Sequence, residues 1–130
     1  MKRSLSLAFT LALPAFAAAA PSPLRVLFLG DSSPASRDHC HILMRELGRD
    51  AVWFDYASNP AQVTAESVGQ FDAVLVEGAA DRFPALASAD KTKLVIESFA
   101  GDGATLGTTE FLKPLQEKLL SAAGATRRAE

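Results

Sequence analysis

The chain has 130 residues, of which 13 are basic, 15 are acidic and one is cysteine. If a cleaved leader removes Lys2 and Arg3, 11 basic residues remain against the 15 acidic ones. This balance lacks the excess of positive charge that is typical of nucleic-acid-binding proteins. A single cysteine cannot form an internal disulfide, so we expect packing alone to stabilise the fold.

The first 20 residues have the pattern of a secretory signal peptide. Two cations precede an apolar run from Leu5 to Phe16, and small residues suited to cleavage follow at 17–20. The run is short for a bilayer span and contains Pro14, which argues against a membrane anchor. We expect residues 1–20 to be removed, the protein to be secreted or periplasmic, and no membrane association once the signal is gone.

Residues 21–130 are predicted to form a single α/β domain. The blocks Val26–Leu29 and Ala73–Val76 are continuously apolar, which is typical of parallel strands covered on both faces. Another strand is expected at Ala51–Tyr56, and a short helix at Thr64–Gly69 returns the chain to the second block. This order of strands and helices predicts a three-layer, flavodoxin-like domain whose mostly parallel sheet has about four strands.

An amphipathic helix is predicted between the first two strands. Ser33 supplies a capping residue, Pro34 suits the first turn, and Gly48 marks a stop. Apolar residues recur at i, i+3, i+4 and i+7 and form its buried stripe: Cys40, Leu43, Met44 and Leu47.

The run His39-Cys40-His41 contains metal-ligating residue types but is not predicted to bind a metal. Consecutive residues on a helix point in different directions, and Cys40 lies on the apolar stripe, so its thiol is expected in the core. The two histidines are expected to flank the stripe as partly solvated side chains. Trp53 and Tyr56 could stack on a sugar ring, but aromatic residues on a strand more often pack in the core.

Two interpretations stay open for the segment before the last helix. The first has a helix at Lys91–Ala100, a turn at Gly101–Gly103 and a strand at Ala104–Thr108. The second makes Leu94–Ile96 the strand, and periodicity alone does not exclude it.

A last helix is expected at Pro114–Ala123. Leu115 and Leu119 lie four residues apart and would share one face of this helix, and Gly124 follows its end. The sequence shows no internal repeat and no second domain.

Candidate functional residues follow two of the predicted strands. Ligands of parallel sheets bind beyond the carboxyl ends of the strands. Asp31 and Ser32 follow the first strand, and Glu77 and Asp81 end or follow the third, so these four are the candidate ligand-binding residues. Carboxylates there could hold sugar hydroxyls or a cation, although solvated loops and helix caps use the same residues. A phosphate or flavin loop is disfavoured, because no further glycine follows Gly30 in the loop and because Pro34 has no backbone N–H to donate.

The stretch VLFLGDSS resembles the first block of the SGNH (GDSL-type) esterases, in which the serine of Gly-Asp-Ser is the nucleophile. This resemblance would make Ser32 the nucleophile of a hydrolase. The base of that family comes from an Asp-x-x-His near the C-terminus, whereas no histidine follows His41 here. The family's Gly-x-Asn-Asp block, which lends oxyanion donors, would fall at Gly78–Asp81, where the asparagine is missing.

A larger part of the chain, from Arg25 to about Thr109, resembles ThuA-like domains. The stretches RVLFLGD, ELGRDAVWFDY, VTAESVGQFDAVLVEG and FAGDGATLG come in the order and spacing of that family, in particular of exported members at the front of larger bacterial proteins. The resemblance implies a fold similar to class I glutamine amidotransferases, with a flavodoxin-like sheet. Two family histidines are absent, one after the first strand and one after Thr108, and the family continues further. The resemblance is therefore to a shortened or truncated domain.

Two function classes follow from these observations. One is a non-catalytic module that binds a small polar or carbohydrate-related ligand, or a partner protein, as the ThuA-like resemblance implies. The other is a hydrolase that uses Ser32. The missing downstream histidine favours the binding module, because a serine needs a positioned base to act as a nucleophile. We expect no cofactor, no metal site and no nucleic-acid partner.

Overall fold

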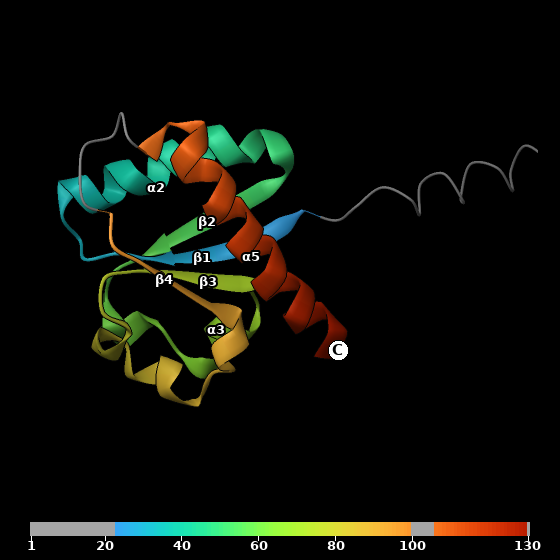
Figure 1. The fold of residues 1–130 in the computed structure, drawn as a ribbon. Helices are drawn as coiled ribbons and strands as arrows, with labels where there is room; N and C mark the ends of the chain where they lie inside the picture. The colour runs from blue at the N-terminus through green and yellow to red at the C-terminus, as the bar shows by residue number, and fades with distance from the viewer. Residues whose placement is uncertain (1–22, 100–105, 130) are drawn as a thin grey trace, which may run out of the picture.

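The structure is a computed structural model that describes residues 23–99 and 106–129. The expected signal peptide, 1–20, and the expected turn at Gly101–Gly103 lie outside these residues. A four-stranded parallel sheet with the order β2-β1-β3-β4 forms the middle layer, and helices lie on both of its faces (Figure 1). The predicted three-layer α/β class is confirmed, and the strand order follows the flavodoxin-like pattern.

The two predicted apolar blocks are the central strands of this sheet. β1 (Leu24–Leu29) pairs with β3 (Ala73–Glu77), while β2 (Val52–Ala57) and β4 (Leu94–Glu97) form the two edges. Successive side chains of a strand point to opposite faces. Both faces of β1 and β3 are covered, which explains why their sequences are continuously apolar rather than alternating.

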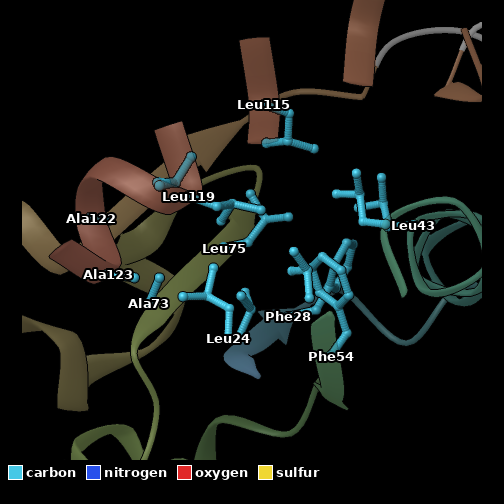
Figure 2. Close-up of a cluster of buried hydrophobic side chains, with 14 of the residues drawn as sticks. Leu24, Phe28, Leu43, Phe54, Ala73, Leu75, Leu115, Leu119, Ala122 and Ala123 are labelled. Carbon is cyan, nitrogen blue, oxygen red and sulfur yellow. The ribbon is translucent and has the colours of Figure 1, made fainter. Parts of the chain in front are cut away.

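One face of the sheet is covered by α2 (Pro34–Leu47) and α5 (Thr109–Ala129). Ser33 caps α2 as predicted, because its side chain accepts a hydrogen bond from the backbone N–H of Ser36. Figure 2 shows side chains from both helices meeting side chains of the sheet in one cluster. Its buried members include Val26, Phe28, Cys40, Leu43, Leu47, Phe54, Leu75, Leu115 and Leu119.

The opposite face is covered by α3 (Ala65–Gly69) and by short 3₁₀ turns, among them Pro84–Ser88, which packs against α3 and buries Leu86. Thr64 and Ser67 form a capping box that fixes the start of α3. The side chains buried on this face come from the alternate positions of the strands and from these connections: Leu27, Leu29, Val63, Val68, Phe71, Val74, Val76, Phe83 and Leu86.

The segment before α5 follows the second of the two interpretations. Residues 91–93 make a single 3₁₀ turn that Asp90 caps, and β4 then pairs in parallel with β3, so the alternative helix at Lys91–Ala100 is wrong. The strand expected at 104–108 does not form over its described part. Leu106 is buried, and the carbonyl of Thr108 accepts hydrogen bonds from the first turn of α5.

The last helix is longer than predicted. α5 begins five residues before Pro114, because Phe111 and Leu112 also pack against the core, and it continues through Gly124. Leu115 and Leu119 are buried on one face as expected. Within the part of the chain that the structure describes, no helix is long and apolar enough to cross a membrane.

We predict that Cys40 resists thiol reagents in the native protein. Its side chain is 1% exposed, and burial raises the pKa of the thiol to about 12. At pH 9 an exposed thiol is largely ionised, whereas Cys40 stays protonated because its pKa lies above the pH. Mass spectrometry should therefore show little modification by iodoacetamide until urea unfolds the chain.

The reference for this experiment is a Cys40→Ala, Ser121→Cys variant, which places the only thiol on the exposed side of α5. This variant should react at the rate of a free thiol. Native modification of Cys40 at a comparable rate would contradict its place in the core.

Candidate functional site

The carboxyl ends of β1, β2 and β3 meet at one edge of the sheet. We call the residues that follow them the carboxyl rim: 30–33 after β1, Ser58 after β2, and 77–82 at the end of β3. All four candidate residues from the sequence belong to this rim. Its geometry depends on how the turn after β1 reaches the start of α2.

Gly30 is required at the beginning of that turn. A Cβ atom at this position would lie 2.0 Å from Oγ of Ser36 and 2.5 Å from the hydroxyl of Tyr56. The chain then passes through Ser32, whose φ of 73° lies in the left-handed region that side-chain-bearing residues rarely adopt. Contacts with β2 hold this conformation, since the Ser32 backbone N–H donates to the Tyr56 hydroxyl at 3.2 Å.

The backbone donors of this turn are used within the protein. The N–H groups of Asp31 and Ser32 donate to the hydroxyls of Ser36 and Tyr56. The N–H of Ser33 donates to Oδ1 of Asp31 at 2.9 Å, and that of Ser36 donates to Oγ of Ser33. A phosphate loop needs these donors to point at the ligand, so this arrangement does not suit an anion.

Arg82 joins the ends of the two central strands. Its guanidinium donates to the carbonyls of Gly30 at 3.1 Å and Glu77 at 2.7 Å, and its Nε donates to the carbonyl of Ala79. The guanidinium also lies 4.9 Å from the centroid of the Phe83 ring. The positive charge of Arg82 is therefore held against backbone carbonyls and helps to shape the rim.

A buried acid–imidazole pair lies at the end of β3. Nδ1 of His39 is hydrogen-bonded to Oε2 of Glu77 at 2.5 Å, and the two side chains are only 10% and 13% exposed. The ring of Phe99 packs edge-on against the imidazole. The other carboxylate oxygen of Glu77, Oε1, is inaccessible to solvent and has no hydrogen-bond partner among the described residues.

The four candidate residues occupy different environments. Asp31 is exposed, and hydrogen bonds from the Ser33 hydroxyl and N–H lower the pKa of its carboxyl group, so it is ionised at neutral pH. Oγ of Ser32 donates to Oγ of Ser58 at 2.6 Å, while Glu77 pairs with His39 and Asp81 is exposed. Over residues 23–99 and 106–129, no three acidic, histidine or cysteine side chains are grouped as metal ligands would be.

The expectation that His39 is a partly solvated side chain is wrong. His39 is buried because it lies one turn after Ser36 on the inner face of α2, and Glu77 supplies the polar partner that makes its burial possible. His41 is exposed, and Cys40 is in the core as expected. Extending the apolar stripe back by one turn, to include Ser36 and His39, would have revealed the inner position of His39.

Two other placements differ from the sequence interpretation. Trp53 is not in the core but is 60% exposed, because nothing covers its face of β2 within the described residues. Tyr56, by contrast, packs against the core as expected of a strand aromatic: its ring centroid lies 5.7 Å from that of Phe28, so it is not free to stack on a sugar. Met44, which belonged to the predicted buried stripe, is also exposed, because it lies toward the outer side of α2.

Comparisons of the chain with protein-family models, with curated proteins and with solved structures find no match.

We predict that Gly30→Ala destabilises the protein by about 1–3 kcal/mol, because the new methyl group would overlap Ser36 and Tyr56. Gly48→Ala is the matched control. Gly48 has a φ of −60° and open space where a Cβ would lie, so this change should leave stability equal or raise it by up to about 1 kcal/mol. Urea unfolding followed by circular dichroism measures both effects, and equal stability of the two variants would contradict the close approach at Gly30.

Proposed function

We propose that this chain is an exported, non-catalytic ThuA-like domain whose carboxyl rim binds a small polar ligand rich in hydroxyl groups, such as a carbohydrate. The observation that carries the proposal is the imbalance of hydrogen-bonding groups at the rim. The backbone donors of the turn at 30–33 and the Arg82 guanidinium are bonded within the protein, whereas the Asp31 carboxylate and the hydroxyl oxygens of Ser32 and Ser58 remain as acceptors.

The acceptors define the chemistry of the ligand. Asp31 is ionised and exposed, and the hydroxyls of Ser32 and Ser58, which follow neighbouring strands, are hydrogen-bonded to each other. Glu77 is not one of these acceptors, because its Oε2 is bonded to His39 and its Oε1 is inaccessible to solvent. A neutral polyol supplies several O–H donors and brings no negative charge toward the carboxylates, whereas a phosphate supplies neither advantage.

The ThuA-like assignment is supported at the level of architecture. The strand order and the helices on both faces agree with the flavodoxin-like sheet that the resemblance implies. Export is supported by the cationic, apolar and small-residue pattern of residues 1–20.

We expect a titration with neutral monosaccharides, namely glucose, galactose and mannose, to perturb the backbone amide resonances of the rim. Asp31→Asn should weaken the binding of whichever sugar binds by about tenfold, because a hydrogen bond to a charged acceptor becomes one to a neutral amide. The oxygen of the new amide can still accept the bond from Ser33, so the turn is preserved.

Asp90→Asn is the matched control for this change. Asp90 is an exposed aspartate whose Oδ1 accepts from the backbone N–H two residues later, as Oδ1 of Asp31 does, but it precedes β4 at the opposite end of the sheet. Its replacement should leave sugar binding unchanged. The proposal would be overturned if none of the three sugars perturbed the rim resonances. The titration should reach the highest sugar concentration that leaves the rest of the spectrum unchanged.

The alternative hydrolase reading predicts a catalytic Ser32, and we expect Ser32→Ala to cause no loss of p-nitrophenyl acetate turnover. The Ser32 hydroxyl donates to Ser58, and no histidine among the described residues makes a hydrogen bond with it. A positioned base typically contributes about 100- to 10,000-fold in rate, so a true nucleophile would be obvious. A loss of more than tenfold, with the circular dichroism spectrum unchanged, would support the esterase instead.

A further inference from the structure

The outer edge of β2 is an open hydrogen-bonding surface. The carbonyls of Ala51 and Ala57 accept from the N–H groups of Leu24 and Gly30, so the odd-numbered residues of this segment direct their backbone toward β1. Because backbone groups alternate along a strand, the N–H and C=O groups of Val52, Phe54 and Tyr56 point away from the sheet. Within residues 23–99 and 106–129, no strand pairs with them.

The two edges of the sheet differ in how they are protected against pairing. β4 has only four residues, follows a turn that contains Lys91, and has the Lys118–Glu97 ion pair at its end. Short length and lysines are devices that prevent edge-to-edge association. β2 has six residues in unbroken register and contains no lysine, proline or bulge.

Apolar surface lies on both sides of the β2 edge. On one face of the sheet Trp53 is exposed. On the other, a groove of about 300 Å³ between α2 and β2 includes Met44 and Phe54 in its lining. It adjoins a second hollow of about 330 Å³ that reaches Val52 and Trp53. An added strand would therefore find apolar contacts for the side chains on both of its faces.

We propose that β2 is a dimer interface, in which a second copy of this chain adds its own β2 antiparallel, with Phe54 opposite Phe54 of the partner subunit. A two-fold axis then makes one sheet that runs through both subunits. The outward backbone groups fix this register. Only pairing centred on Phe54 lets Val52, Phe54 and Tyr56 all meet outward-facing residues of the partner.

Charge complementarity favours the same register. It places the exposed Trp53 opposite the partner subunit's Asp55, with Arg25 on the neighbouring strand directly beside Trp53. The guanidinium of Arg25 lies 4.0 Å from the carboxylate of Asp55 in its own chain. In the dimer it can also pair with Asp55 of the partner subunit. A register centred on Asp55 would instead set two carboxylates opposite each other, which is unfavourable.

Sedimentation velocity over a range of protein concentrations tests the proposal. The wild-type protein should form a dimer. Trp53 is the sole tryptophan, so its emission should move to shorter wavelength as concentration rises and its ring becomes buried. A protein that stays monomeric up to about 100 μM, with unchanged emission, would overturn the proposed interface.

A pair of charge variants tests the register. Trp53→Glu sets a carboxylate opposite the partner subunit's Asp55, whereas Trp53→Lys sets an ammonium group there, and both remove the same aromatic ring. We expect the dimer dissociation constant of Trp53→Glu to exceed that of Trp53→Lys by at least tenfold. Trp53 is largely exposed, so neither change should prevent folding, which circular dichroism can verify. Equal weakening by both variants would contradict the register.

Ile96→Glu is the control for the other edge, since Ile96 is 53% exposed on β4. This variant should dimerise as the wild type does. If Ile96→Glu dissociates the dimer and Trp53→Glu does not, the interface lies at β4 and the proposal is wrong.

Discussion

Two-sided burial of the central strands is the constraint on which the rest of the structure depends. Val26 and Phe28 of β1 face α2 and α5, while Leu27 and Leu29 face α3 and the turns near it. Since all four side chains are at most 5% exposed, neither layer of helices can be omitted without exposing half of the strand. Parallel strands in such an arrangement all end at the same edge, which is why polar loops collect there.

The chemistry of the carboxyl rim follows from how that edge is closed. Arg82 bonds to carbonyls at the ends of β1 and β3, which would otherwise be left without donors where the ladder stops. The first turn of α2 uses its own hydroxyls in the same way for the N–H groups of the loop. Each of these contacts uses a donor of the protein and leaves oxygen acceptors at the rim, as the proposed binding of a hydroxyl-rich ligand requires.

The sequence was sufficient for the features that depend on local pattern. The apolar blocks, the capped start of α2 and its buried stripe could be predicted because each depends on residues close together in the chain. The strand at β4 could not be chosen over a helix, because its stability comes from pairing with β3. The His39–Glu77 pair was missed for the same reason, since its two members lie 38 residues apart and meet only when α2 packs over the sheet.

Tyr56 joins the two surfaces for which functions are proposed. Its ring packs on Phe28 in the core, and its hydroxyl contacts both Ser36 and the backbone N–H of Ser32. Its own backbone faces the open edge of β2. The left-handed conformation of Ser32 therefore depends on the position of an edge strand, which pairs with β1 alone among the described residues. A strand added beyond β2 would hold Tyr56 from the second side and so restrict the turn that presents Asp31 and Ser32 at the rim.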